Sequence, residues 1–470
     1  MPNNVHIDDA IPERHQDFQL HESLSRLSRL KLRLKSRLQL RQLIDCSVVS
    51  AIVGIVFLVA SWLPVSESRR QRFLVLSTPR LGTGLLQRLG RRVLAPWLAP
   101  QKVDRWRENQ IGWSRYLGEF ADIRKQPALT TSLLLKEPGP DGEKGVIYSS
   151  FEFNWMKLVV NHDVRKLLKN YYLVGASSWS PSDHAVLANL CGLSDDPIFI
   201  GISNLTDMQQ YRMFSPWIEP LPLMATDWID PSAFDPLPHS ERTIDILMVA
   251  HTCYWKRHWL LFNALKTMRK DLNVVLIGRT GVRGKADILS EARAFGVKQE
   301  ITFLNNLEID EVMRYQCNSK ISLALSKREG SCVAITESLF ADTPVGVMQD
   351  AHIGAKAHIN EHTGKILVPG RMSYTLERML ETSSEFSARE WAKNNISARA
   401  SSQKLNDLLK KQNLKNGSPW TKDITPMCWR YVPRYLDSRD GERMESGREV
   451  LRREYGIEFE DFVSENHGKG

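Results

Sequence analysis

Two glutamates, Glu329 and Glu337, stand eight residues apart after the apolar run ISLALS, and Gly330 follows the first of them. The residues after Gly330 are compatible with a helix, so Glu337 is predicted about two helical turns beyond Glu329. Carboxylate oxygens accept hydrogen bonds from hydroxyl groups, as a neutral, hydroxyl-rich ligand requires. Gly330 has no side chain and lets the backbone approach such a ligand closely.

A second group of polar residues follows the apolar run IDILMVA, in the loop 251–258. His251, Lys256 and Arg257 supply cations there. When a bond to a diphosphate breaks, the leaving group accumulates negative charge, and a fixed Lys or Arg stabilises that charge without a metal ion. Lys256 is the leading candidate for this role.

Short apolar, β-branched runs are expected to position these two loops. They lie at 244–250, 273–278, 300–304, 321–325 and 344–348, with helix-compatible stretches between them. This alternation predicts a doubly wound α/β domain with buried parallel strands. Sheets of this kind bind ligands beyond the carboxyl ends of their strands, where helix N-termini present free N–H groups. We therefore expect both polar loops at one edge of the sheet.

A similar alternation begins at residue 129. The runs LTTSLLL, GVIYSSFEF, YYLVGAS and PIFIGIS predict a first parallel sheet. Residues 72–77 can form a further strand, with Gly82 and Gly84 in a glycine loop before a helix. Prolines concentrated between 216 and 238 indicate an extended connection, and we place the domain boundary there.

The ordered motifs resemble the retaining GT-B glycosyltransferases called glycosyl transferases group 1, or family four. That family carries two glutamates separated by seven residues and followed by a turn into Pro-Val, and this chain reads EGSCVAITESLFADTPV. The segments VVLIG, FLNNLEIDEVMRYQCNSKISLALS, INEHTGKILVPG and WIDPSAFDP also follow the family's order. The resemblance covers residues 225–370 closely and 129–224 loosely. It implies two Rossmann-like doubly wound domains that face a cleft.

The resemblance also implies roles for individual residues. Glu329 contacts the donor hexose, Glu337 the ribose and Lys256 the diphosphate. The backbone after Gly330, at Ser331 and Cys332, contacts the sugar or a phosphate. The reaction retains the anomeric configuration, and neither a cofactor nor an essential metal is expected beside the nucleotide-sugar co-substrate.

Three positions depart from the family's pattern. His251 stands where the family usually has Arg, so the diphosphate is expected to depend more on Lys256 or Arg257. Asp342 replaces a usual Gly, and Ala357 replaces a usual Glu. We therefore expect a donor preference that differs from that of common members.

Two residues outside these motifs complete the candidate site. His162, after GVIYSSFEFNWMKL, is a candidate to act on the acceptor as histidines of the family can, although a lone His is also commonly structural. Gly278 begins a GxxGxxG loop that does not match the dinucleotide fingerprint, so it is expected to permit a turn at the donor site.

The formal net charge of +9 is largely local, because seven Lys and Arg lie between residues 26 and 41 without an acid. This arm has no interleaved aromatic residues for base stacking, so anionic lipid is favoured over nucleic acid as its partner.

Residues 47–63 carry no charge and are just long enough to span a bilayer. Three readings stay open: an interfacial or re-entrant anchor, a true span, or a buried helix. Because nucleotide sugars are made in the cytosol, we expect a membrane-associated protein whose catalytic lobes face the cytoplasm.

The six cysteines show neither a CxxC pair nor the spacing of a zinc site.

The expected organisation is a basic amphipathic arm (1–44), a hydrophobic membrane-anchor segment (45–65), a Rossmann-like acceptor domain plus linker (66–240), a nucleotide-sugar donor domain (241–370), and a helical return segment with a charged tail (371–470). The predicted function is hexosyl transfer from a nucleotide sugar to a glycan or lipid-linked acceptor. The alternative is a catalytically degenerate GT-B protein that binds carbohydrate or acts as a scaffold at the membrane.

Overall fold

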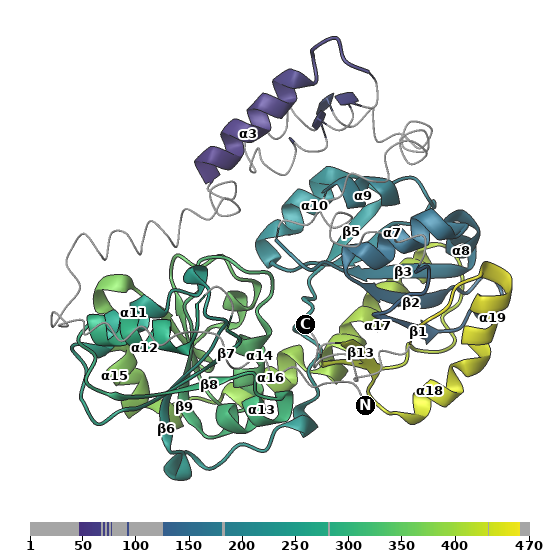
Figure 1. Ribbon diagram of the computed structural model, residues 1–470. Helices are drawn as coiled ribbons and strands as arrows, with labels where there is room; N and C mark the ends of the chain where they lie inside the picture. The colour runs from purple at the N-terminus through teal and green to yellow at the C-terminus, as the bar shows by residue number, and fades with distance from the viewer. Residues whose placement is uncertain are drawn as a thin grey trace, which may run out of the picture.

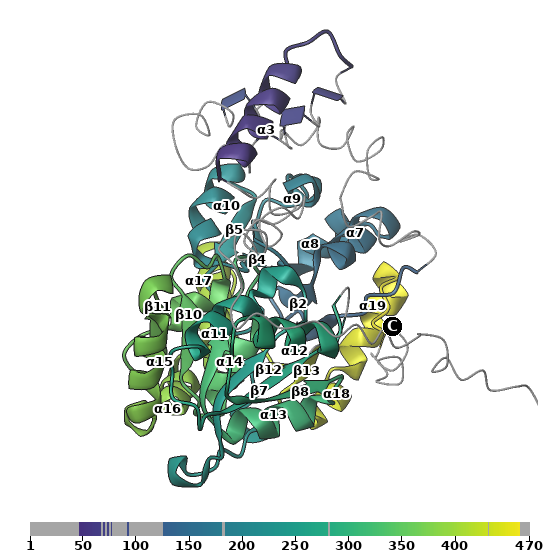
Figure 2. The ribbon, with the colours of Figure 1, turned by 60° about the vertical axis from the view of Figure 1, so that its left-hand side comes forward.

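The computed structural model describes residues 47–66, 126–180, 184–280, 283–430 and 432–460, with a few single residues between 69 and 93. The predicted basic arm (1–44), Gly82 and Gly84 lie outside the described residues. Two α/β domains stand beside each other (Figure 1). A view turned by 60° shows the helix α3 at one end of the molecule, on the side of the first domain (Figure 2). The prediction of an α/β protein with parallel sheets is confirmed.

The second domain contains a six-stranded sheet in which every neighbouring pair is parallel. Its strands are β6 (Ile244–Val249), β7 (Asn273–Gly278), β8 (Glu300–Asn305), β9 (Ser319–Ala324), β10 (Val345–Met348) and β11 (Gly364–Leu367). The strand order is β11-β10-β9-β6-β7-β8, so the winding reverses between β6 and β9. This is the doubly wound arrangement that the sequence predicts.

Helices on both faces of this sheet complete the second domain. They are α11 (His258–Leu265), α12 (Lys285–Ala294), α13 (Ile309–Cys317), α14 (Val333–Phe340) and α15 (Met372–Glu381). Fully buried side chains such as Leu261, Leu339 and Leu376 pack with the strands into one apolar core. That core fixes the strand ends from which the polar loops emerge.

The first domain contains a five-stranded sheet in the order β1-β2-β3-β4-β5. The strands are β1 (Ser132–Lys136), β2 (Gly145–Ser150), β3 (Tyr171–Ala176), β4 (Ile198–Gly201) and β5 (Ile218–Leu221). Strand β1 pairs antiparallel with β2, whereas the other pairs are parallel. The prediction of a wholly parallel sheet is therefore wrong at its edge, and the proline-rich connection contributes the strand β5.

The first sheet is also not doubly wound within the described residues, contrary to the predicted fold class. Its strands follow one another in sequence, and right-handed crossovers then place all connecting helices on one face. That face carries α7 (Glu152–Asn161), α8 (Val164–Asn170), α9 (His184–Leu190) and α10 (Met208–Phe214). The other face is covered by Leu405 and Leu409 of α17 (Ala398–Lys415), which pack against Tyr148 and Val174.

The C-terminal part of the chain returns to the first domain. Helix α16 (Ala388–Ile396) still packs in the core of the second domain. The chain then forms α17, the hairpin of β12 (Met427–Arg430) and β13 (Val432–Tyr435), α18 (Arg439–Arg443) and α19 (Glu445–Tyr455). Leu451 and Ile457 are completely buried in the first domain's core. The predicted tail of few apolar residues is thus, up to residue 460, an integral part of that domain.

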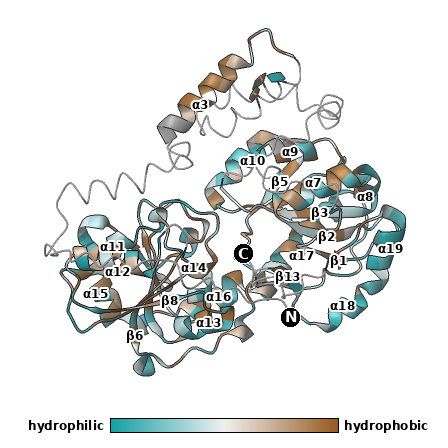
Figure 3. Cartoon of the chain, in the orientation of Figure 1, coloured by the Kyte–Doolittle hydropathy of each residue, from teal (hydrophilic) through white to brown (hydrophobic). Residues whose placement is uncertain are grey.

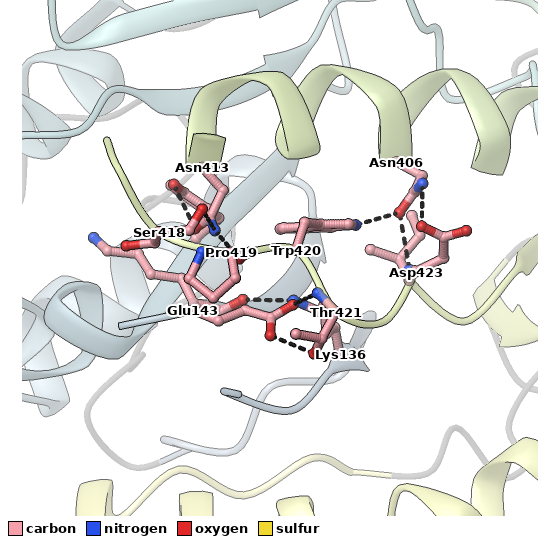
Figure 4. Close-up of polar contacts among 12 residues, drawn as sticks. Lys136, Glu143, Asn406, Asn413, Ser418, Pro419, Trp420, Thr421 and Asp423 are labelled. Atoms are coloured by element: carbon pink, nitrogen blue, oxygen red, sulfur yellow. Dashed lines mark hydrogen bonds and ion pairs between the residues drawn. The ribbon is translucent and has the colours of Figure 1, made fainter. Parts of the chain in front are cut away.

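A buried ion pair fastens this return segment to the first sheet (Figure 4). The carboxylate of Glu143 pairs with Lys136, and it also accepts hydrogen bonds from the backbone N–H and the hydroxyl of Thr421 at 2.7 and 2.6 Å. The Lys136 ammonium lies 3.6 Å from the ring centroid of Trp420. These contacts lower the pKa of Glu143 to about 2 against the opposing effect of its burial.

The uncharged segment forms the helix α3 (Ser47–Ala60), whose hydrophobic character stands out in Figure 3. Leu58 is buried, and the ring of Phe57 stacks on that of Phe73 at 6.0 Å. Within the described parts of the chain, no helix combines the length and the apolarity needed to cross a membrane. Phe73, Leu74 and Ser77 are helical, so the predicted strand at 72–77 is wrong.

Candidate functional site

A cavity of about 480 Å³ lies at the carboxyl ends of β6 and β7 in the second domain. It brings together six of the predicted site residues, each from a strand exit or from the first turns of α14. The lining residues are Val249, Ala250, His251, Lys256, Ile277, Gly278, Arg279, Asn306, Leu307, Ile309, Val312, Glu329, Cys332, Val333, Ala334 and Glu337. The cavity therefore occupies the position at which open α/β sheets bind ligands.

Lys256 and Glu329 form an ion pair in the wall of this cavity. Lys256 ends the short turn after β6, and Glu329 lies in the loop after β9. The Lys256 Nζ donates a hydrogen bond to the Glu329 Oε1 at 2.6 Å, and both side chains are largely buried, with 13% and 15% exposed. Burial opposes the charge on Lys256, but the Glu329 carboxylate outweighs it, so the pKa of Lys256 lies above its usual value. Lys256 thus places a permanent positive charge in the cavity.

His251 does not supply a second permanent charge. Burial lowers its pKa, and the neighbouring cations Lys256 and Arg279 lower it further. A histidine with a lowered pKa is mainly neutral near pH 7. The replacement of the usual Arg by His therefore removes positive charge from this part of the cavity.

Arg279 lines the cavity, although sequence reasoning did not select it. It follows Gly278 directly at the end of β7, and its side chain is exposed. Arg279 follows the end of a strand just as His251 does, so the argument that selected His251 applied to Arg279 as well. It was missed because the glycine loop was interpreted only as a turn.

Glu337 lies in α14, in a mainly apolar part of the cavity beside Ile309, Val312 and Val333. Its side chain accepts a long hydrogen bond of 3.4 Å from the amide of Gln316. Burial raises the pKa of Glu337 to about 7, only partly offset by that hydrogen bond. A carboxyl with such a pKa gains most from a ligand that donates hydrogen bonds to its charged form.

Two glycines allow close backbone approach at the site. A side chain at Gly278 would place its Cβ 2.0 Å from the carbonyl oxygen of Ala250, so only glycine lets β6 and β7 end this close together. At Gly330 the Cβ would lie 2.6 Å from the carbonyl oxygen of Ser178, which belongs to the first domain. Gly330 therefore lies at the contact between the two domains.

Ser331 and Cys332 follow this contact. Ser331 is buried, and its carbonyl accepts a hydrogen bond from the backbone N–H of Ala355 at 2.9 Å. Cys332 lines the cavity and caps the start of α14 with a positive φ of 67°. The first N–H groups of a helix have no partners within it, so the start of α14 offers backbone donors to the cavity.

The guanidinium of Arg257 does not line the cavity, contrary to the predicted donor-binding role. Its Nη1 and Nη2 donate to the carboxylate of Asp350 at 2.9 to 3.0 Å. Its remaining donors bind the carbonyl oxygens of Leu325 and Ser326. The side chain is buried and donates to the loops after β9 and β10, so Arg257 holds these two loops together.

His162 lies away from the domain contact, contrary to its predicted role at the acceptor. It follows the last residue of α7, which starts at the carboxyl end of β2 and runs back along the sheet for about 15 Å. His162 lies near Gly456, which follows the end of α19. Burial lowers the pKa of His162. His162 is therefore not among the residues at the carboxyl ends of the first sheet's strands.

Polar contacts between the domains were not predicted. The Ser180 hydroxyl lies 2.8 Å from Nε2 of His352, and Arg328 Nη2 donates to the Ser180 carbonyl at 2.9 Å. Burial and the nearby cations lower the pKa of His352 to about 4, so this histidine is neutral. These pairs join residues about 150–170 positions apart, and a local sequence pattern cannot predict such a contact.

The described residues contain no group of three or more His, Cys, Asp or Glu side chains arranged to hold a metal ion.

The model of the family Glycosyl transferases group 1 matches residues 230–398. This segment includes all six strands of the second sheet and every residue that lines the cavity. The second domain therefore contains the segment that matches this family's model, and the match supports a transferase.

No curated protein matches the sequence. Among solved structures, the chain is similar to sucrose-phosphate synthase from Thermosynechococcus elongatus, with 13% identity, a TM-score of 0.43, and coverage of 58% of this chain and 74% of that chain. It is also similar to HepE of Anabaena in complex with UDP, with 14% identity, a TM-score of 0.44, and coverage of 57% and 78%. Likeness at this level extends to neither activity nor substrate.

Proposed function

We propose that the protein is a GT-B glycosyltransferase that moves a hexosyl group from a nucleotide sugar to a glycan or lipid-linked acceptor, with retention of configuration. The observation that carries the proposal is the cavity at the ends of β6 and β7. There a buried cation (Lys256), two carboxyl groups (Glu329 and Glu337) and the start of a helix converge. These are the groups that a diphosphate bonded to two hydroxyl-rich rings requires.

The two parts of the cavity suit the two parts of a nucleotide sugar. Glu337 lies beside Ile309 and Val312, where it can accept hydrogen bonds from ribose hydroxyls while the base rests on apolar side chains. Glu329 lies at the domain contact formed by Gly330, where the transferred hexose has to meet the acceptor. Lys256 lines the same cavity, 2.6 Å from Glu329, so a diphosphate bonded to the hexose would lie within its reach.

The proposed chemistry is electrostatic. When the donor binds, the Lys256 ammonium exchanges part of its contact with Glu329 for a phosphate oxygen, and Glu329 accepts a hydrogen bond from a hydroxyl of the hexose. As the bond to the anomeric carbon breaks, charge grows on the diphosphate, and the fixed positive charge of Lys256 stabilises it. The N–H groups at the start of α14 add to this stabilisation. This scheme requires neither a cofactor nor an essential metal.

We further propose that the protein works at an anionic membrane surface with its catalytic lobes in the cytoplasm. The helix α3 supports this proposal because Ile52, Val56 and Val59 of the helix, and Trp62 just after it, are each at least half exposed. Exposed apolar side chains beside a basic segment suit interfacial attachment. Washing membranes with sodium carbonate tests the mode of attachment, because release into the wash would exclude a true span.

The proposed activity is tested by a donor screen with the purified full chain. Transfer or slow hydrolysis of at least one UDP- or GDP-hexose is expected, and Glu329→Gln should abolish it without unfolding the protein. Binding of a nucleotide without any turnover would instead favour the catalytically degenerate alternative, which the neutral state of His251 motivates.

A further inference from the structure

Three aromatic side chains gather at the carboxyl end of β2 in the first domain: Phe151, Phe153 and Trp429, here called the aromatic cluster. The ring centroids of Phe151 and Phe153 lie 5.9 Å apart in a stacked arrangement. The centroids of Phe151 and Trp429 lie 5.7 Å apart, edge to face. All three side chains are partly exposed, so their rings are accessible to a ligand.

The aromatic cluster lies on the side of the first domain that faces the donor cavity. Glu152, between the two phenylalanines, accepts hydrogen bonds from the backbone N–H and the hydroxyl of Ser178, the latter at 2.7 Å. The carbonyl of the same Ser178 contacts Gly330, the neighbour of Glu329. Ser178 therefore links the start of α7, which carries two of the cluster's three rings, to the loop that carries Glu329. Trp429 belongs to the β12–β13 hairpin, whose β13 lies on the inner side of the first domain (Figure 1).

The backbone of Phe151 points to a role for its ring. Phe151 has a φ of 66° and a ψ of 140°, a conformation that residues with a Cβ rarely adopt and glycine adopts more readily. Its N–H donates to the carbonyl of Ala176 at 2.9 Å, which holds the residue in place. Folding alone would be served better by glycine at this position.

We propose that the aromatic cluster binds a sugar ring of the acceptor by stacking. The C–H face of a pyranose ring is apolar and fits against an aromatic face, while its hydroxyl groups need polar partners at the edge. Ser178 is partly exposed, and its hydroxyl, which donates to Glu152 beside the cluster, can still accept a hydrogen bond from a sugar hydroxyl. A polyprenyl chain has no hydroxyl to donate, so the rings together with this oxygen favour a glycan acceptor. The inference rests on the proposed glycosyl transfer.

The test uses the full chain on a printed array of mono- and oligosaccharides, with vesicles that contain polyprenyl phosphate in parallel. Phe153→Ala and Trp429→Ala should each weaken binding of the glycan preferred by the wild type by about tenfold. Phe153→Tyr, which keeps a ring, should bind as the wild type does. Tyr374→Ala is the matched control, because Tyr374 is 69% exposed on α15 of the other domain.

Phe151→Gly guards against a trivial loss of folding. It relieves the positive φ, so its Tm should equal or exceed that of the wild type, while its glycan binding falls. Calorimetry with UDP and GDP should give the same affinity for all variants. The proposal is overturned if the wild type binds no glycan on the array, if the ring-deleting variants bind glycans as the wild type does, or if the rings matter only for polyprenyl vesicles. If the wild type bound neither UDP nor GDP, the proposed function would be contradicted. The array would still report whether the aromatic cluster binds glycans.

Discussion

The Nζ of Lys256 lies 2.6 Å from the Oε1 of Glu329, so two residues 73 positions apart meet within one cavity. The pairing follows from the strand order, because β6 and β9 are neighbours in the sheet and their carboxyl ends share one edge. Each side chain can exchange its partner for a part of the donor.

Glu329→Gln is expected to lower the turnover number by about 100-fold or more, because the charged hydrogen-bond acceptor that holds the hexose is lost. The amide is nearly isosteric and can still accept a hydrogen bond from Lys256, so the variant should stay folded, with a Tm lowered by the loss of the buried ion pair. Steady-state kinetics on the best donor of the screen, together with thermal unfolding, measure both quantities. Unchanged turnover in the folded variant would remove Glu329 from the proposed mechanism.

Lys256→Met is expected to weaken UDP or GDP binding by about 10- to 100-fold, since a charge-assisted contact to phosphate is lost. Lys327→Met is the matched control, because Lys327 is 40% exposed and pairs with Asp350 outside the cavity. Calorimetry at constant ionic strength compares the two variants. Equal losses in both would mean that the effect is general electrostatics and not a contact of Lys256.

Arg257→Lys is expected to affect stability and not donor binding. A lysine cannot reproduce the two-pronged contact with Asp350 and the two carbonyl contacts, so the free energy of unfolding should fall by about 3 kcal/mol. The folded fraction should bind nucleotide with nearly wild-type affinity. Urea unfolding and calorimetry together decide the matter, and a stable variant with poor nucleotide affinity would restore Arg257 to the binding site.

Glu337→Gln is expected to change the pH dependence of stability. The folded pKa of Glu337 is raised to about 7 from 4.5, so between these values the folded state binds more protons than the unfolded state. The wild type therefore loses about 3 kcal/mol from this residue as the pH rises from below 4.5 to above 7, and the variant does not. Urea unfolding at pH 5 and pH 8 should show that the variant gains relative to the wild type at pH 8. A difference between the two proteins that is the same at both pH values contradicts the raised pKa.

The second domain could be predicted from the sequence to a large extent. Its strands are short apolar runs with clear ends, so the loops of Lys256 and Glu329 were expected at one sheet edge, where the structure places them. Strand β11 was missed because it lies at the edge of the sheet and exposes Lys365 and Ile366. An edge strand does not need the continuous apolar pattern of a buried one.

The failures share a physical origin in contacts between distant segments. Arg257 looked like Lys256 in the sequence, and only the position of Asp350, 93 residues further on, decides that its side chain turns away from the cavity. The cover of the first sheet by Leu405 and Leu409 could not be inferred from α17, because a helix does not specify which sheet it packs against. His162 was misjudged because the direction of α7 was not considered.

Calorimetric titration of the purified full chain with UDP and with GDP tests the central claim most directly, because the claim places a nucleotide sugar in the cavity of the second domain. We predict that one of the two nucleotides binds with a one-to-one stoichiometry and that the affinity rises from pH 6 to pH 8, as ribose hydroxyls favour the charged form of Glu337. Failure of both nucleotides to bind the folded wild-type protein at either pH would contradict the account.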